Sequence, residues 1–594
     1  MVSWLKHIQD FRPHKTISGH ERKTIITWGL TALAVFLVLL YGRRFSGLGT
    51  SGGTWRAQMP GTSGSDGESA RHFSEVLASA LDKFPPLKDI RNPGWPTADA
   101  QQDHWSPDEK EPMDNLKSPT KDIIEMRDAH QGFVDTITEK LVDYAPSTRS
   151  RSARRGIVTV GGGKYFPPLL VSLRLLRRTG NTLPVEVFLP ESEYEEALCE
   201  EVLPSLNTQC RKFPKVGSNS IGRFQFKIFA VLLSSFQELL LIDADDIPLV
   251  NIAPYFDAQA FKDTGLVTWP DFWHTTVSPL YYLISSQPAM PLSRRPSTES
   301  GQMFIDKTKH WKTLLLAAYY NYYGPTYYYP LLCQNAVGCG DKETFLPAAE
   351  VFNLSFYEVK TPVESVGHRL SNDGKAGHAL LQGDFVQEYV LTQSLEGKPW
   401  SDDRKVLYAD IKPMFLHMSP PKWDPAVLLE RISQWSTLIV DIDGKPSAAW
   451  QHPPEAANKI KGAERMAWEE ARWVACNLEG KFKTWKGKTT PYEEAQTLRS
   501  LHNVPSVMLL GDSVIERIQT TGHSPNFGPG SPDHPPQPWP SPLLLSDECL
   551  ESLTPSAQVG VQRIEDVFNA GVGGDKFENI LYRLQAISHA NCQV

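Results

Sequence analysis

Strand-like and helix-like segments alternate between residues 156 and 269, and this order limits the fold more than any other feature of the chain. Short apolar runs, typical of buried strands, are separated by segments whose apolar residues recur every three or four positions, which is typical of helices. This alternation predicts an α/β fold with a mostly parallel sheet and helices on both of its faces. The predicted strands are Gly156–Val160, Val185–Leu189, Leu239–Ile242 and Gly265–Trp269, and the predicted helices are Pro167–Thr179, Glu191–Glu201 and Phe224–Glu238.

The third predicted strand ends in three acidic residues, Asp243, Asp245 and Asp246. Ligands of parallel α/β sheets bind beyond the carboxyl ends of the strands. Two carboxylates two residues apart can bind a divalent cation there, and the cation can neutralise a diphosphate. The alternative is that these aspartates form a turn or cap a helix, because Asp is common in both places.

A glycine turn follows the first predicted strand and places Gly161 and Gly162 at the same edge of the sheet as the acids. A backbone without side chains either lets a nucleotide approach closely or only makes a tight turn. The glycines do not complete the G-x-G-x-x-G pattern, so no nicotinamide cofactor is predicted.

The length and charge of the chain limit its domain count and its partners. The chain has 594 residues, too many for one typical domain, and a formal net charge of −8. The negative charge argues against nucleic acid as the main partner. Sixteen Trp and nineteen Tyr residues fit a carbohydrate-binding surface as well as an aromatic core.

Residues 25–41 form an apolar run without a charged residue, with basic residues on both sides. A helix of this length spans about 25 Å, which suits a thin bilayer of the early secretory pathway. The excess of Lys and Arg before the run predicts a single-pass type II membrane anchor, with residues 1–24 in the cytoplasm. A cleaved signal peptide is the alternative, but no small-residue cleavage site follows the run.

Residues 42–120 are rich in Gly, Ser, Pro and charged residues, which predicts a flexible luminal stem. Within this stem, one short helix is predicted at Ser69–Phe84. The spacing of apolar residues predicts a further helix at Lys121–Tyr144, which packs on the domain that follows.

The seven cysteines bear on the compartment, because disulfides form in the oxidising lumen of the secretory pathway. Cys199 and Cys210 are close in sequence, as are Cys333 and Cys339, and each pair could close a short loop. The remaining three cysteines leave at least one odd thiol, and the sequence alone does not fix the connectivity.

Nine short motifs between about residues 150 and 490 carry a family resemblance. They are Gly156–Tyr165, Leu183–Phe188, Phe224–Lys227, Asp243–Asp245, Trp269–Trp273, Glu299–Gln302, Tyr319–Pro325, Gly340–Phe345 and Phe415–His417. Together they resemble the fungal Golgi mannan α-mannosyltransferases of glycosyltransferase family 71, and the members that make α-1,2 linkages more closely than those that make α-1,3 linkages.

The resemblance implies a GT-A-type fold, which is Rossmann-like, as a catalytic domain over residues 121–490 with a linker at 491–506. It implies a retaining transfer of mannose from GDP-mannose to mannan or to the outer chain of an N-glycan, with Mn²⁺ as the cofactor. It also implies a Golgi membrane location with the catalytic domain in the lumen, and a complex with other Golgi enzymes.

A cation at Asp243 and Asp245 would stabilise the diphosphate leaving group of such a transfer. Oxygen ligands admit Mn²⁺ or Mg²⁺ and do not choose between them. His417 ends a later strand-like run, and the resemblance to GT-A enzymes makes it the candidate third ligand; a histidine packed at a strand end is the alternative. Asp246 stands where the family often has Asn, which favours a cap over a ligand.

Four residues are candidates for contact with the GDP part of the donor. Gly161 and Gly162 follow the first strand, and the resemblance makes Lys227 and Lys422 candidates for the phosphates. The alternative for a lysine is a stem packed on apolar residues with its charge in solvent.

Three further acids are candidates at the reacting carbon. Asp271, flanked by Trp269 and Trp273, resembles a sugar-binding corner, although an aromatic core explains these tryptophans equally well. Glu299 and Asp341 could stabilise the positive charge of the transition state or orient the acceptor hydroxyl. The sequence decides neither this assignment nor whether retention uses a carboxylate nucleophile or front-face attack.

The last part of the chain, residues 507–594, resembles the first two blocks of the SGNH/GDSL hydrolases. By this resemblance Ser513 would be the nucleophile, and the backbone of Gly571 would contribute to the oxyanion hole. The block that supplies the base is absent, and a serine needs a base to be a competent nucleophile. A truncated fragment without activity is therefore favoured over an esterase that acts through Ser513.

Overall fold

The computed structural model describes a large part of the chain between residues 64 and 486. The described residues are 64–89, 95, 115–142, 154–288, 295–336, 338–369, 375–395, 407–419, 422–426 and 448–486. Those from Glu68 onward belong to one compact unit. The predicted anchor at 25–41 and the hydrolase-like fragment with Ser513 and Gly571 lie outside the described residues. Among the described helices, none is long and apolar enough to span a membrane.

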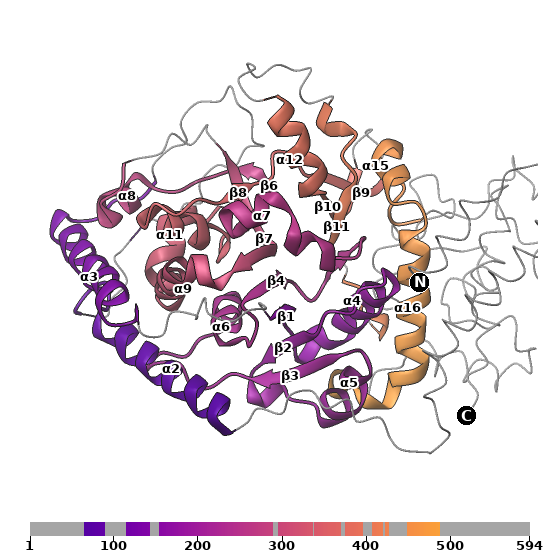
Figure 1. Cartoon of the computed structure of the whole chain (residues 1–594), viewed down its shortest axis with the longest axis horizontal. Coiled ribbons are helices and arrows are strands. Elements are labelled where there is room, and N and C mark those ends of the chain that lie inside the picture. Colours follow the sequence, from indigo (N-terminus) through magenta and orange to yellow (C-terminus); the bar gives the residue numbers. More distant parts are fainter. Residues whose placement is uncertain are drawn as a thin grey trace, which may run out of the picture. The chain divides into compact units, whose positions relative to one another are not determined.

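A seven-stranded sheet in the order β3-β2-β1-β4-β7-β6-β8 forms the centre of this unit (Figure 1). Its strands are β1 (Arg155–Val160), β2 (Val185–Leu189), β3 (Thr208–Lys212), β4 (Glu238–Ile242), β6 (Leu266–His274), β7 (Pro296–Asp306) and β8 (Tyr357–Glu358). Strands β3, β2, β1 and β4 run parallel to one another. The predicted α/β fold with a mostly parallel sheet is confirmed for this half.

The other half of the sheet departs from the prediction, because β7 is antiparallel to both of its neighbours, β4 and β6. The sheet is therefore mixed, with β8 added parallel to β6 at the edge. Strand β7 begins with polar residues, Pro296 to Gly301, so its first half lacks the apolar run on which the prediction of strands depended.

Apolar residues of the central strands alternate between two cores, because successive side chains of a strand point to opposite faces. Ile157 and Leu240 belong to the core on one face. Val158 and Leu241 belong to the core on the other face. A sheet buried on both faces explains why these strands read as continuous apolar runs.

Helices cover both faces of the sheet (Figure 1). On the first face, α4 packs against α16; on the second, α6 packs against α9, and α3 packs on α8 and α9. The helices are α2 (Gly64–Lys83), α3 (Thr120–Glu139), α4 (Phe166–Arg178), α5 (Leu203–Ser205), α6 (Gln225–Leu233), α7 (Gln259–Thr264), α8 (Pro279–Ser285), α9 (Lys307–Tyr322), α10 (Tyr329–Cys333), α11 (Phe345–Val351), α12 (Phe385–Ser394), α15 (Pro454–Lys459) and α16 (Ala463–Leu478).

A second, four-stranded antiparallel sheet in the order β5-β11-β10-β9 was not predicted as a sheet. Its strands are β5 (Asp246–Pro248), β9 (Glu364–Arg369), β10 (Lys375–Gly383) and β11 (Pro413–Met418). The strand-like run at Pro413–His417 is confirmed as β11. Strand β5 follows β4 after only three residues, so the two sheets meet at the predicted acids.

Two predicted helices differ from the structure. The predicted helix at Phe224–Glu238 ends at Leu233, because Ser234 adopts an extended conformation and starts the chain toward β4. The predicted helix at Glu191–Glu201 is instead a short 3-10 turn at Glu191–Glu193 followed by a π-helical segment at Ala197–Val202.

The predicted stem is not flexible throughout, since part of it packs on the second core. Leu77 and Leu81 of α2, together with Leu87 and Leu116, are buried there. The predicted helix at Ser69–Phe84 corresponds to α2, and the one at Lys121–Tyr144 corresponds to α3. The compact unit therefore begins before residue 120, because these apolar side chains find a buried face that the local composition did not reveal.

The structure settles the pairing of four cysteines, which the sequence left open. Cys199 is bonded to Cys210, and Cys333 is bonded to Cys339.

Candidate active site and metal centre

The Asp243–Asp245 segment forms a turn between the two sheets. The backbone N–H of Asp243 donates to the carbonyl of Gly301 on β7 (2.7 Å), and the N–H of Asp246 donates to the carbonyl of Asp243 (3.1 Å). The first bond extends the pairing of β4 with β7, and the second closes the turn. Both aspartates are thereby fixed at the carboxyl end of β4, where ligands of such sheets bind.

His417 reaches these aspartates from the second sheet. On β11 it lies opposite Asp246 of β5, and its Nε2 is 3.3 Å from Asp245 Oδ1 and 3.9 Å from Asp243 Oδ2. One ligand atom from each of Asp243, Asp245 and His417 lies within 4.8 Å of the other two. The structure thus brings together the three residues predicted as metal ligands, and two carboxylates with one imidazole can bind a divalent transition metal.

Gly301 makes room for His417. A Cβ at residue 301 would lie 2.5 Å from His417 Nδ1 and 3.0 Å from Glu299 Oε1. Glu299 Oε1 itself accepts a hydrogen bond from the N–H of Gly301 (2.6 Å) and lies 3.7 Å from His417 Nδ1. The predicted acid Glu299 therefore lies beside the imidazole, on the side away from the aspartates.

Two lysines neutralise the aspartates. Lys227 Nζ on α6 donates to Asp243 Oδ2 (2.8 Å) and lies 3.9 Å from Asp341 Oδ2. Lys422 Nζ lies 2.5 Å from Asp245 Oδ2 and also donates to the carbonyl of Met418. The structure therefore places both predicted phosphate-binding lysines at the acids, Lys227 at Asp243 and Lys422 at Asp245.

The electrostatics of the cluster reflect burial and crowded charges. Burial opposes protonation of His417, but the hydrogen bond with Asp245 and the charge of Glu299 raise the pKa of His417 to about 10. Burial also opposes ionisation of Asp245, yet His417 and Lys422 hold the pKa of Asp245 below its usual range. Burial raises the pKa of Glu299 above its ordinary value and that of Asp341 to about 6. A cation bound to His417 would have to displace its proton.

Asp246 does not cap a helix, contrary to the prediction. Its side chain is 1% exposed, and neither of its carboxylate oxygens has a hydrogen-bond partner among the described residues. Burial raises the pKa of Asp246 well above its ordinary value. The amide of Gln302, which lies opposite Ile242 at the end of β4, also has no hydrogen-bond partner in the described part of the chain.

Asp271 lies near the middle of β6, where Lys342 Nζ contacts its Oδ2 (2.9 Å). Of the two alternatives for Trp269, the structure supports the aromatic core, because this residue is 1% exposed in the first core. Its ring packs on Phe304 and Phe415, and its indole N–H donates to the carbonyl of Gly383 (2.8 Å). The sequence alone could not decide between the two, because it does not show whether a tryptophan faces solvent or the core.

Gly161 and Gly162 follow β1, which is the parallel neighbour of β4. A Cβ at residue 161 would lie 2.7 Å from Val187, so Gly161 permits close packing inside the sheet. Gly162 has a φ of 105°, and a Cβ there would lie 2.5 Å from Glu193. These glycines line the same edge as Asp243, and their contact with a nucleotide stays a prediction.

Sequence reasoning missed the residues that support the predicted acids. Lys342 contacts Asp271, and Ser300 Oγ donates to Asp341 Oδ1 (3.2 Å). The order acid–lysine–acid at Asp341–Glu343 could have indicated these partners. Charged residues that are buried need a partner, and three in a row need several.

Comparison with known proteins shows which proteins this chain resembles. Residues 154–295 and 286–384 match the Mannosyl_trans3 family model, which describes a mannosyltransferase. The chain is 35% identical to alpha-1,2-mannosyltransferase MNN5 of Saccharomyces cerevisiae over 328 residues (46% of this chain, 56% of the relative). It is 37% identical to alpha-1,2-mannosyltransferase MNN2 of the same yeast over 332 residues (49% and 55%). It is 31% identical to alpha-1,2-mannosyltransferase MNN2 of Candida albicans over 414 residues (59% and 66%).

Solved structures with a weaker likeness include the galactosyltransferase LgtC (13% identity, 46% of this chain and 88% of that chain, TM-score 0.26) and the glycosyltransferase GlyE of Streptococcus pneumoniae (11% identity, 35% and 46%, TM-score 0.25).

The sequence matches make residues 154–384 similar to a mannosyltransferase family, and they make the chain similar to yeast alpha-1,2-mannosyltransferases. The chain spans about half the length of MNN5 and of the yeast MNN2. The matches do not support the hydrolase resemblance of residues 507–594.

Proposed function

We propose that this protein transfers mannose from GDP-mannose to a mannose residue of a glycan, in α-1,2 linkage and with retention of configuration. The cluster of Asp243, Asp245 and His417 at the carboxyl end of β4 carries the proposal. The relatives support the sugar and the linkage, since all three are named alpha-1,2-mannosyltransferases.

The cluster suits a divalent cation, because two carboxylate oxygens and one imidazole nitrogen converge from two sheets. Mg²⁺ takes oxygen ligands almost without exception, so the imidazole favours Mn²⁺ over Mg²⁺. When bound, the cation supplies positive charge to the diphosphate leaving group.

Charged side chains of the protein would stabilise the other charges of the reaction. Lys227 and Lys422 provide positive charges next to Asp243 and Asp245, suited to the phosphate oxygens of the donor. Glu299 and Asp271 provide carboxylates on β7 and β6, neighbouring strands of the first sheet. Negative charge close to the anomeric carbon stabilises the positive charge that develops there as the bond to the leaving group breaks.

We also propose that the catalytic unit works in the Golgi lumen, anchored by residues 25–41 as a type II membrane protein. The two disulfides support an oxidising compartment. The apolar run with its preceding basic residues supports the orientation.

The test is donor and linkage specificity. The purified full chain is incubated with Mn²⁺, an α-mannoside acceptor, and GDP-mannose, UDP-glucose or UDP-galactose in turn, and the product linkage is determined by NMR. We expect transfer from GDP-mannose alone and a new α-1,2 bond. An α-1,3 bond would refute the linkage, and transfer from a UDP-sugar in preference to GDP-mannose would refute the donor.

A further inference from the structure

Three consecutive buried residues connect the candidate site to its surroundings through ion pairs. The pairs are Asp341 with Lys227 (3.9 Å), Lys342 with Asp271 (2.9 Å) and Glu343 with Arg295 (2.6 Å). Glu343 also accepts a hydrogen bond from the N–H of Thr298 (2.7 Å). The segment at 341–343 therefore fixes α6, β6 and the start of β7 relative to one another.

The ion pair of Lys342 and Asp271 fixes the orientation of one candidate catalytic carboxylate. Asp271 Oδ2 accepts from Lys342 Nζ, and Oδ1 accepts from the N–H of Phe272 (2.7 Å). The side chains of Lys342 and Asp271 are only 8% and 11% exposed. Because both oxygens have a donor and neither residue is well solvated, removal of the ammonium would leave a poorly solvated charge free to turn.

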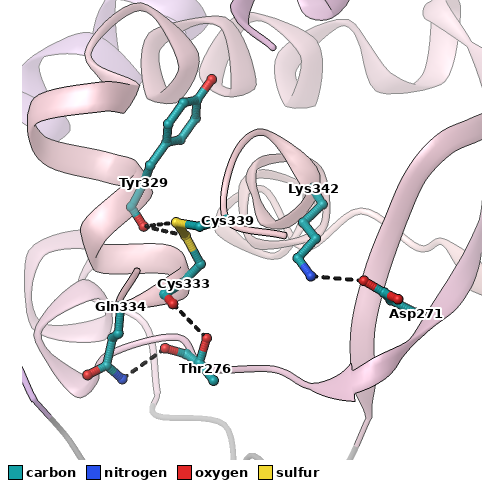
Figure 2. Close-up of a disulfide and its surroundings, with 7 residues drawn as sticks. All are labelled: Asp271, Thr276, Tyr329, Cys333, Gln334, Cys339 and Lys342. Carbon is teal, nitrogen blue, oxygen red and sulfur yellow. Dashed lines mark hydrogen bonds and ion pairs between the residues drawn. A yellow bond between two sulfur atoms is a disulfide. The ribbon is translucent and has the colours of Figure 1, made fainter. Parts of the chain in front are cut away.

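A disulfide-closed loop lies close to this ammonium. The Cys333–Cys339 bond closes the loop just before Lys342, and a Cβ at Gly338, whose φ is 75°, would lie 3.1 Å from Lys342 Nζ. Figure 2 shows the disulfide beside the ion pair of Lys342 and Asp271.

The same loop is attached to the segment that follows β6. Thr276 Oγ1 donates to the carbonyl of Cys333 (2.9 Å), and the side-chain amide of Gln334 donates to the carbonyl of Thr276 (2.9 Å) (Figure 2). The loop thus contacts the chain after β6 at Thr276 and lies close to Lys342, the partner of Asp271 on β6.

We propose that Lys342 is a positioning residue that orients Asp271 for sugar transfer, and that the Cys333–Cys339 disulfide keeps Lys342 in place. The proposal rests on the proposed function, since it assigns Asp271 to the transfer step. No hydrogen bond or ion pair joins Lys342 or Asp271 to the three metal-ligand candidates within the described residues. We therefore expect that removing the Lys342 ammonium lowers turnover and leaves binding of the donor unchanged.

The first experiment compares Lys342→Met and Lys342→Arg in the full chain. We expect Lys342→Met to lower kcat by about 10- to 100-fold, the scale of a misplaced catalytic group. Binding of GDP with Mn²⁺, measured by calorimetry, should stay within about twofold of wild type, and Lys342→Arg should recover part of kcat because it restores the cation. The control is Lys262→Met at an exposed lysine, which should leave both quantities unchanged.

A double-mutant comparison separates positioning from stability. If Lys342 acts through Asp271, the variant Lys342→Met combined with Asp271→Asn should be no slower than Asp271→Asn alone. Additive losses would overturn the proposal, as would wild-type kcat in Lys342→Met or equal losses of kcat and GDP binding. If Lys342→Met does not fold, the Lys342→Arg variant and the disulfide variants below decide the matter.

The second experiment uses the two disulfides as a matched pair. Cys333→Ser with Cys339→Ser should lower kcat while GDP binding is retained, whereas Cys199→Ser with Cys210→Ser, at the β3 edge, should lower Tm and leave kcat unchanged. Equal effects of the two double variants on kcat would overturn the role of the Cys333–Cys339 loop. A wild-type chain that binds GDP and Mn²⁺ yet transfers no mannose would refute the proposed function instead.

Discussion

Gly301 is the residue at which the two sheets come close enough to assemble one metal centre. Asp243 and Asp245 come from the first sheet and His417 from the second, and Gly301 on β7 faces the imidazole without a side chain. Its carbonyl also accepts the N–H of Asp243. The geometry of the cluster therefore depends on a residue that itself provides no ligand.

Substitution of Gly301 by Ala should damage the metal centre. The new Cβ would be 2.5 Å from His417 Nδ1, closer than nonbonded atoms approach, so the imidazole must move. We expect weaker Mn²⁺ binding, measured by EPR titration, and lower transfer activity. Gly222→Ala is the control, because a Cβ there has open space around it. Wild-type Mn²⁺ affinity in Gly301→Ala would show that His417 is not a ligand.

At the residue scale the sequence predicted the acids and His417 better than it predicted their neighbours. Asp243 and Asp245 are predictable because they directly follow the apolar run of a predicted strand. The burial of Asp246 is not, since it depends on β11 packing beside β5. Nor is the inward position of Trp269, which follows from packing against residues far along the chain.

At the scale of elements, helix α3 is held to the second core by a buried histidine. His130 Nε2 bonds with the hydroxyl of Tyr320 on α9 (2.8 Å), and its ring stacks on that of Tyr320. Burial lowers the pKa of His130 to about 4. The imidazole is therefore neutral in the folded protein at pH values where it would be protonated in the unfolded chain.

This contact should make stability depend on pH. The contribution of neutral His130 is complete above its ordinary pKa of 6.5 and is lost as the pH falls toward about 4, because the unfolded chain takes up the proton first. One proton corresponds to a slope of at most about 1.4 kcal/mol per pH unit. In urea unfolding, His130→Phe should lose less unfolding free energy than wild type when the pH falls from about 6.5 to about 4.5. Identical losses in the two proteins would contradict the assignment.

The strands that the sequence predicted, among them β1, β2, β4 and β11, contain apolar runs, and several of those it missed are short or polar. Strand β3 has the sequence Thr-Gln-Cys-Arg-Lys and lies at an edge, so it needs no apolar run. Strand β5 has only three residues, and β7 begins with six residues that contain no large apolar side chain. Pairing with distant strands forms these elements, and no local pattern reports such pairing.

At the scale of the whole molecule, the compact unit includes a segment predicted to be part of the stem. Leu81 of α2 is fully buried in the second core, and Tyr323 and Tyr319 donate hydrogen bonds to the carbonyls of Leu81 and Phe84. The unit thus includes a helix, α2, that precedes the sheet in the sequence and packs near the tyrosines at the end of α9.

Leu81→Ala should destabilise the whole unit. Loss of a fully buried leucine costs about 2–5 kcal/mol of unfolding free energy. The control is Leu283→Ala at an exposed position, which should change stability by about 0.5 kcal/mol or less. Denaturant unfolding measures both variants. If Leu81→Ala unfolds like wild type, α2 does not belong to the cooperative unit.

The most direct test of the central claim is metal-dependent transfer by Asp243→Asn and Asp245→Asn. Mannose transfer from GDP-mannose is measured while Mn²⁺ is titrated into the metal-stripped full chain, and circular dichroism confirms that each variant is folded. We predict that wild type is inactive without the cation and recovers with Mn²⁺, and that neither folded variant recovers at saturating Mn²⁺. Near-normal turnover by either variant, or full wild-type activity in EDTA, would contradict the assignment of Asp243 and Asp245 as the cation site.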